Sequence, residues 1–207
     1  MGFFDSIHER GIAIEFLVIP AFFAESDVSE SLKSASWKRR CEFAAGRLAA
    51  RKALASFGVA AEVIPRSKTG APVWPCGSVG SISHSATHAC AVAAHTGSYK
   101  SLGIDIEPQS SMNRIESLRN CFLMETEKSL SPLEAFITFS AKEALFKMIF
   151  PLANQFFGFE SAFVKDIDCR AVTLTLNESI GSFSRGSCFQ AIFGFHHNHI
   201  VTLCMQK

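Results

Sequence analysis

Two carboxylates stand two residues apart in the segment 103–107, which reads Gly-Ile-Asp-Ile-Glu. The alternation over 102–106 predicts a strand, and side chains two apart on a strand point to the same face, so Asp105 and Glu107 should lie side by side. Neighbouring carboxylates repel each other unless a cation or a proton lies between them. Oxygen ligands suit Mg²⁺, which takes one or two carboxylates and completes its shell with phosphate and water. The alternative is a strand end whose acids face solvent.

A carboxylate and an ammonium group, Glu143 and Lys147, stand four residues apart in a predicted helix and therefore share one face. An ordinary surface ion pair would explain this spacing. Against that alternative, the neighbouring positions of the helix are mostly apolar, so the pair should border a cleft. These apolar neighbours are Phe139, Leu145, Phe146 and Met148.

Ser83 and His84 end a short predicted strand over 81–83. A histidine at the end of a strand can contact a phosphate group, and a satisfied core or loop histidine is the alternative. Basic residues crowd into one stretch of the first half, and they are Lys38, Arg39, Arg40, Arg47, Arg51 and Lys52.

The elements that must position these residues follow from periodicity and from turn residues. Strands are predicted over 12–19, 81–83, 90–94, 102–106, 171–176, 189–195 and 200–204, and helices over 34–57, more weakly over 115–122, and from 132 to about 150. The order is not a regular alternation of strand and helix, which favours an α+β fold over a doubly wound parallel sheet. A boundary near 97–100 divides the chain into halves 1–98 and 99–207.

The last of these helices has the best-marked start. Ser131 stands at the N-cap, Pro132 at the first helical position and Glu134 three residues after the cap, which is a capping box with the preferred proline. Pro151 is expected to end the helix at Phe150.

Composition bounds the class of protein. The chain has 207 residues, 48% of them hydrophobic and 19% charged, which predicts a sizeable core and argues against disorder. The net charge of +1 gives no reason to expect nucleic acid or an anionic membrane as a partner. Seven cysteines without a C-x-x-C pair indicate reduced, mostly buried thiols and a cytoplasmic location. No signal peptide or membrane span is predicted.

Two motifs in this order resemble the signature of the 4′-phosphopantetheinyl transferases: Gly-Ile-Asp-Ile-Glu at 103–107 and Phe-Ser-x-Lys-Glu-Ala-x-x-Lys at 139–147. Within that family the chain is similar to the two-domain class of peptide and siderophore synthetase activators, the enterobactin synthetase component D type. Further resemblances are at 45–52, 66–75 and 81–84, and the whole covers roughly residues 38–165.

The resemblance implies transfer of the phosphopantetheine arm of coenzyme A to a serine of an apo carrier protein, leaving adenosine 3′,5′-bisphosphate. It implies that Asp105, Glu107 and Glu143 hold Mg²⁺, with Mn²⁺ as a substitute. It also implies that Glu143 is the general base, directly or through a water, and that Lys147 pairs with the phosphate nearest the reaction.

The resemblance further implies phosphate contacts to coenzyme A from the first half. His84 would make one of them, with Ser83 orienting the strand end. Arg47, Arg51, Arg66 and Lys68 are the other candidates, of which Arg66 is favoured. The turn 70–72 reads Gly-Ala-Pro, whereas many relatives carry a lysine or arginine at its centre; Lys68 could replace that charge.

The implied fold is two similar α+β halves related by a pseudo-twofold axis, with coenzyme A between them, in a monomer. Carriers of siderophore or other nonribosomal peptide synthesis are the expected partners. Fatty acid or polyketide carriers, including those for polyunsaturated fatty acids, are the alternative. A non-catalytic coenzyme A-binding module and a structural subunit of a synthetase complex are the competing functions.

Two weaker patterns lie outside these motifs. His197 and His199 could be taken for a metal pair, but a hairpin turn with exposed histidines is the preferred interpretation. A group of phenylalanines could form an apolar surface for a carrier helix, namely Phe122, Phe136, Phe156 and Phe157.

Overall fold

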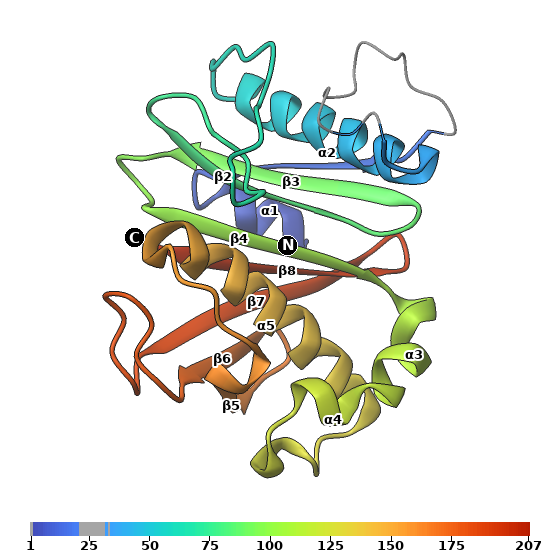
Figure 1. Cartoon of the computed structure of the whole chain (residues 1–207), viewed down its shortest axis with the longest axis vertical. Coiled ribbons are helices and arrows are strands. Elements are labelled where there is room, and N and C mark those ends of the chain that lie inside the picture. The colour runs from blue at the N-terminus through green and yellow to red at the C-terminus, as the bar shows by residue number, and fades with distance from the viewer. Residues whose placement is uncertain (1, 21–31, 33) are drawn as a thin grey trace. The chain divides into compact units, whose positions relative to one another are not determined.

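The computed structural model describes residues 2–20, 32 and 34–207. The chain divides into two compact units, Met1–Tyr99 and Lys100–Lys207, next to the boundary expected from the sequence. Each unit contains one long helix and one antiparallel sheet (Figure 1). The expected α+β class is confirmed, whereas the pseudo-twofold relation between the halves stays a prediction.

The first unit is built on a three-stranded sheet in the order β1-β3-β2. Its elements are α1 (Phe3–His8), β1 (Ala13–Val18), α2 (Trp37–Ala55), β2 (Ser78–His84) and β3 (His88–His95). The helix α2 begins after Ser36, whose side chain accepts a hydrogen bond from the backbone of Arg39, and it ends before Gly58, where φ is 82°. The predicted helix over 34–57 is therefore correct in type and slightly too long.

Small residues let α2 lie close to this sheet. Ala49, Ala50 and Ala53 are fully buried and pack with Ala91 and Ala93 of β3. A β-carbon built on Gly46 would lie 2.8 Å from Cγ2 of Ile82 in β2. The small size of these residues brings the polar residues of α2 within reach of the end of β2, where Arg39 contacts His84.

The second unit has a five-stranded antiparallel sheet in the order β4-β8-β7-β6-β5. Its strands are β4 (Ser101–Pro108), β5 (Ala162–Ile167), β6 (Ala171–Leu176), β7 (Cys188–His196) and β8 (His199–Gln206). Its helical elements are η3 (Gln109–Ser111), α3 (Met112–Ser117), α4 (Arg119–Phe122), η4 (Glu125–Glu127), α5 (Pro132–Ala153) and η5 (Phe159–Ser161). The strand β5 was not predicted, because its sequence Ala-Phe-Val-Lys-Asp-Ile does not alternate and the pairing with β6 shifts register between Val164 and Asp166.

The helix α5 begins as the sequence predicts, with Ser131 and Glu134 forming the capping box. Its predicted end at Phe150 is wrong, because the helix continues to Ala153 with Pro151 inside it. Proline has a helical φ, and in the last turn its missing N–H removes only one hydrogen bond. The left-handed C-cap Asn154, at φ 47°, ends the helix instead.

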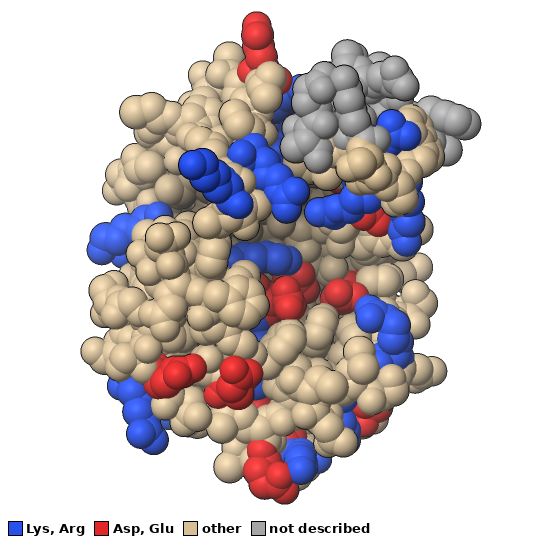
Figure 2. Space-filling model, in the orientation of Figure 1, with Lys and Arg blue, Asp and Glu red and all other residues tan. Residues whose placement is uncertain are grey.

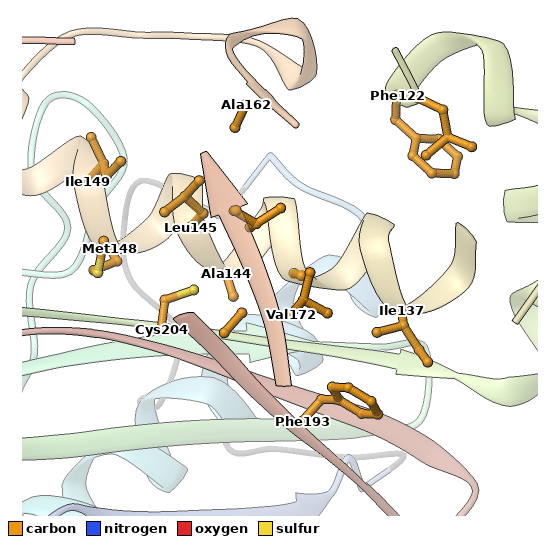
Figure 3. Close-up of a cluster of buried hydrophobic side chains, with 14 of the residues drawn as sticks. Phe122, Ile137, Ala144, Leu145, Met148, Ile149, Ala162, Val172, Phe193 and Cys204 are labelled. Atoms are coloured by element: carbon orange, nitrogen blue, oxygen red, sulfur yellow. The ribbon is translucent and has the colours of Figure 1, made fainter. Parts of the chain in front are cut away.

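The apolar face of α5 supplies the core of the second unit (Figure 3). Ala144, Leu145 and Met148 are fully buried there, and the strands contribute Val172 and Cys204. This packing holds α5 across the sheet, over β4 and β8.

The predicted apolar surface for a carrier helix is wrong for most of its members. Phe122, Phe136 and Phe157 are 2%, 0% and 8% exposed, because they pack into the core of the second unit. Phe156 is 79% exposed and is the one ring of this group that solvent reaches.

The hairpin between β7 and β8 is confirmed: His196 pairs with His199, and His197 and Asn198 have φ of 45° and 58° in the turn. The expectation that its histidines are exposed is wrong for His199, which is 3% exposed and whose Nδ1 lies 2.8 Å from the carbonyl oxygen of His197.

The cysteines differ from expectation in burial. All seven are free thiols, but only Cys41, Cys90 and Cys204 are buried, and the other four are exposed. Within the residues described, no helix has both the length and the hydropathy needed to cross a bilayer.

Candidate active site

The polar site of the second unit is centred on Asp105, which β4 presents toward α5. Its side chain is buried, at 4% exposure, so the alternative of two solvent-facing acids does not hold for this residue. The Nζ of Lys147 lies 2.6 Å from Oδ1 of Asp105. The second oxygen, Oδ2, accepts a hydrogen bond of 2.9 Å from Ser140 Oγ. Both partners come from α5, so the helix and the strand are joined through this one carboxylate.

Glu107 lies two residues further along β4 and is partly buried. Its Oε2 accepts a hydrogen bond of 3.1 Å from Ser111 Oγ and lies 3.7 Å from Nη2 of Arg114. Burial, and next the neighbouring charge of Asp105, raise the pKa of Glu107 to about 7. Burial thus contributes more to this shift than the charge of Asp105 does, and both disfavour the ionised form of Glu107 where no cation is bound.

Glu143 presents a third carboxylate from α5. Burial raises the pKa of Glu143, the charge of Lys147 opposes this shift, and the charge of Asp105 adds to it. Asp105 is thus close enough to influence both glutamates. A partly buried carboxylate with a raised pKa is a better proton acceptor than an exposed one.

Among the described residues, no three acids, histidines or cysteines are placed to bind a metal ion together, so Asp105, Glu107 and Glu143 do not form such a group in this structure. The chemistry fits Mg²⁺, because this ion needs only one or two carboxylates when phosphate and water complete its shell. The ammonium group of Lys147 already stands as a cation against Asp105.

An apolar pocket adjoins Glu143 in the same unit. It is lined by Glu143, Leu145, Phe146, Phe156, Phe157 and Phe159, among others. Behind it lies a buried ion pair: Lys142 Nζ is 2.7 Å from Glu127 Oε2, and both side chains are 2% exposed. Lys142 also donates to the carbonyl oxygens of Phe122 and Phe159, so the pair ties one wall of the pocket to α5.

A separate basic pocket lies within the first unit, where Lys and Arg side chains gather near α2 (Figure 2). Its lining includes Arg39, Glu42, Phe43, Arg47, Arg66 and His84. Of the residues predicted to bind phosphate, the structure therefore brings together Arg47, Arg66 and His84.

Arg47 carries the observation that points most directly to an anion. Its buried Nε has no hydrogen-bond partner among the described residues, and its guanidinium lies 4.5 Å from the centre of the Phe43 ring. Burial, followed by the charges of Arg66 and Arg39, lowers the pKa of Arg47 to about 10. Several cations crowded around an unsatisfied donor favour binding of a negatively charged group.

His84 lies at the end of β2 and contacts α2. Its Nε2 is bonded to Arg39 Nη1, and because arginine can only donate, Nε2 accepts and the ring proton lies on Nδ1. That Nδ1 is 3.8 Å from Oε2 of Glu42.

Arg66 is brought to the pocket by the turn that follows it. Its Nε donates a hydrogen bond of 3.3 Å to the carbonyl of Gly70, where φ is 94°, and Arg66 pairs with Pro72 in an isolated bridge. Ala71 adds no charge to this turn, as the sequence shows.

Three other residues of the first unit that the sequence predicts for the coenzyme A site do not line this pocket. Arg51 donates to the carbonyl of Glu62 at 3.0 Å, Lys68 is exposed, and Ser83 is buried. Arg39 and Glu42 were missed. A signal was present, because Arg39, Phe43 and Arg47 recur every four residues and so share a helix face.

An acidic site and a basic pocket with an unsatisfied arginine donor suit the binding of a phosphorylated ligand. Two family models match the chain: the 4′-phosphopantetheinyl transferase N-terminal domain at residues 27–94 and the 4′-phosphopantetheinyl transferase superfamily at residues 101–204. The chain belongs to the 4′-phosphopantetheinyl transferase superfamily. The superfamily model matches as far as residue 204, so the resemblance extends beyond the range 38–165 that was expected from the sequence.

Two of the curated relatives described next carry the same family name, and the third is named enterobactin synthase component D. The chain is 36% identical over 133 residues to the 4′-phosphopantetheinyl transferase Npt of Nocardia iowensis, covering 61% of this chain and 59% of the relative. It is 35% identical over 134 residues to PptT of Mycobacterium tuberculosis, covering 61% and 58%. It is 32% identical over 182 residues to enterobactin synthase component D of Salmonella typhimurium, covering 84% and 75%. The chain thus spans under two thirds of the first two relatives.

Proposed function

We propose that this protein transfers the 4′-phosphopantetheine group of coenzyme A to a serine of an apo carrier protein, giving holo carrier protein and adenosine 3′,5′-bisphosphate. The observation that carries the proposal is the arrangement at Asp105. A buried carboxylate of β4 meets Lys147 of α5 within the segment that matches the superfamily. Glu143, one helical turn before Lys147, completes the set of side chains proposed to take part in the transfer.

The phosphates of coenzyme A are assigned to the basic pocket of the first unit. Arg47 offers a buried donor without a partner, and Arg66 and His84 line the same pocket. Arginine binds phosphate oxygens with paired hydrogen bonds, so these side chains fit the 3′-phosphate and the diphosphate. Arg51, Lys68 and Ser83 stay predictions of the sequence without support from this lining.

The metal is assigned to Asp105, Glu107 and Glu143, with Mg²⁺ as the ion and Mn²⁺ as a substitute. When bound, the ion would neutralise the diphosphate and stabilise the charge that develops on the leaving oxygen. Phosphate oxygens from the substrate would supply the ligands that the protein lacks.

Glu143 is the general base in this proposal, directly or through one water. It accepts the proton of the carrier serine as the serine oxygen forms a bond to the transferred phosphorus and the phosphorus–oxygen bond to adenosine 3′,5′-bisphosphate breaks. Burial raises the pKa of Glu143 in the metal-free protein. A bound divalent ion would oppose this shift, which favours the route through a water. Lys147 would then turn its ammonium group from Asp105 to the phosphate nearest the reaction.

The apolar pocket beside Glu143 has the chemistry to receive the pantetheine arm. Its walls include Phe146, Phe156, Phe157 and Phe159. The arm has methylene and methyl groups that such walls can contact, between two amides and one hydroxyl. Binding of the arm in this pocket would bring the reacting phosphate, at the end of the arm, close to the proposed base.

Carriers of siderophore or other nonribosomal peptide synthesis are the proposed partners, since one set of relatives is named enterobactin synthase component D. Fatty acid or polyketide carriers, including those for polyunsaturated fatty acids, are the alternative. We also propose that the protein is a monomer and that it is located in the cytoplasm.

The decisive experiment is transfer of a labelled pantetheine arm from coenzyme A to a panel of purified apo carriers with Mg²⁺ present. We expect a mass increase of one phosphopantetheine on the carrier, highest for peptidyl carriers of siderophore synthetases. Asp105→Asn and Glu143→Gln should abolish this transfer. Coenzyme A binding without transfer to any carrier would favour the non-catalytic binding module, and no binding at all would favour a structural subunit.

A further inference from the structure

A chain of three buried polar side chains runs from β8 through α5 to β4. Ser140 Oγ lies 2.9 Å from Thr202 Oγ1 and 2.9 Å from Asp105 Oδ2. Ser140 and Thr202 are both 0% exposed, and Asp105 is 4% exposed. Asp105 and Thr202 are direct partners across the β4–β8 pairing, so both side chains lie on the sheet face that α5 covers.

The number of available protons sets the direction of these two hydrogen bonds. An ionised carboxylate can only accept, and a serine hydroxyl has one proton, so Ser140 donates to Asp105. The hydroxyl of Thr202 then donates to the oxygen of Ser140. Each bond polarises the next in a buried environment, which strengthens the contact at the carboxylate.

We propose that Ser140 is a positioning residue for Asp105, with Thr202 as its support. By holding Oδ2, the two hydroxyls fix the rotation of the carboxylate and leave Oδ1 for a cation. Lys147 occupies Oδ1 in this structure, and Asp105 would be one of the residues that hold the divalent ion when it is bound. The inference rests on the proposed function, because it concerns the carboxylate assigned to the metal.

The bond at Ser140 is not the one that a serine inside a helix ordinarily makes. Such a hydroxyl usually returns to the carbonyl four residues earlier in its own helix. Here the two hydrogen bonds join Ser140 to the strands of the sheet instead, at Asp105 of β4 and Thr202 of β8. Hydrogen-bond partners of metal-binding carboxylates typically change metal affinity or activity by about 10- to 100-fold when removed.

The same helix offers a matched control. Thr138, two residues before Ser140, is 0% exposed, and its Oγ1 has no hydrogen-bond partner within the described part of the chain. Thr138→Val and Thr202→Val both replace a buried hydroxyl with a methyl group of similar size. Only Thr202→Val removes a hydroxyl from the series of hydrogen bonds that ends at Asp105.

The test measures Mn²⁺ binding to the whole protein with coenzyme A present, by the loss of the free-ion signal in electron paramagnetic resonance. We expect Ser140→Ala to raise the Kd for Mn²⁺ by about 10- to 100-fold. Thr202→Val should raise it less, Ser140→Cys should fall between Ser140→Ala and the wild type, and Thr138→Val should leave it unchanged. Transfer by Ser140→Ala should recover at high Mn²⁺ concentration.

Thermal unfolding of each variant identifies any loss of the folded protein. If Ser140→Ala and Thr202→Val fold and bind Mn²⁺ as the wild type does, the positioning role is overturned while the proposed function stands. If the wild type binds no Mn²⁺ with coenzyme A and transfers nothing to any carrier, the proposed function fails and the inference fails with it.

Discussion

Gly103 of β4 lies directly against the carbonyl oxygen of Ala144 in α5, so closely that a β-carbon built on Gly103 would be 2.0 Å from that oxygen. The backbone nitrogen of Met148 would be 2.5 Å away. Backbone atoms cannot rotate away as side chains can. This contact therefore sets the spacing between the strand that carries Asp105 and the helix that carries Lys147.

Gly103→Ala should separate the helix from the strand. We expect a loss of about 1–3 kcal/mol in the free energy of unfolding, because the added methyl group overpacks a backbone contact. Carrier modification should fall as well, since Lys147 and Asp105 would move apart. Urea denaturation measures the first effect and the transfer assay the second.

Gly97→Ala is the control for this substitution, because nothing lies within 4 Å of a β-carbon built at Gly97. It should leave stability and transfer close to those of the wild type. Equal stability of the two alanine variants would refute the close packing at Gly103.

The buried ion pair gives a second prediction. Lys142→Met leaves the Glu127 carboxylate buried without its partner, so the free energy of unfolding should fall by about 3–5 kcal/mol. Adding Glu127→Gln removes that uncompensated charge, and the double variant should be more stable than Lys142→Met alone. Denaturant titrations of the double-mutant cycle measure this coupling.

Lys128 and Glu125 form an exposed ion pair that serves as the comparison, with side chains 46% and 84% exposed. Lys128→Met should change the free energy of unfolding by only about 0–1 kcal/mol. A double variant less stable than Lys142→Met would contradict the electrostatic explanation.

Stability without metal should depend on pH through Glu107. The folded protein raises the pKa of this group from 4.5 to about 7, so it keeps a proton that the unfolded chain releases. The stabilisation from that proton is complete below the unfolded pKa and is lost as pH rises through the folded pKa. Glu107→Gln should therefore become more stable relative to wild type as pH rises, by on the order of 3 kcal/mol at about pH 8.

Urea denaturation without divalent ions, at several pH values between about 4.5 and 8, measures this difference. Glu125→Gln, at an exposed glutamate, is the control and should show no such trend. A constant difference between Glu107→Gln and the wild type across this range would disprove the shift.

The basic pocket predicts selective effects on coenzyme A. Arg47→Ala and Arg66→Ala should each raise the KM for coenzyme A by about 10- to 100-fold with little change in kcat, the cost of one charge-assisted hydrogen bond. The variant that lost its contact to the 3′-phosphate should match the wild type when dephospho-coenzyme A is the substrate. Steady-state kinetics with both substrates distinguishes the two arginines.

Two basic residues on α2 outside the lining complete this series. Lys52→Ala should be neutral, and Arg51→Ala tests a phosphate ligand that the sequence suggested and the pocket does not include. An unchanged KM for Arg47→Ala together with a raised KM for Arg51→Ala would reverse the assignment.

Local patterns identified much of this protein in advance. The strand that carries Asp105 and Glu107 follows from alternation, and the start of α5 follows from Ser131, Pro132 and Glu134. The order and spacing of the two motifs already indicate the family to which the chain belongs. These features depend on residues a few positions apart, whose geometry the backbone sets by itself.

Contacts between distant segments were decided only by the tertiary structure. The meeting of Arg39 with His84, the hydrogen bonds of Ser140, and the burial of Phe122 and His199 all join elements far apart in the sequence. Periodicity shows which face of an element is apolar, but not which element covers it or how closely. That depends on how the side chains of both elements pack together, as the glycine contact between β4 and α5 shows.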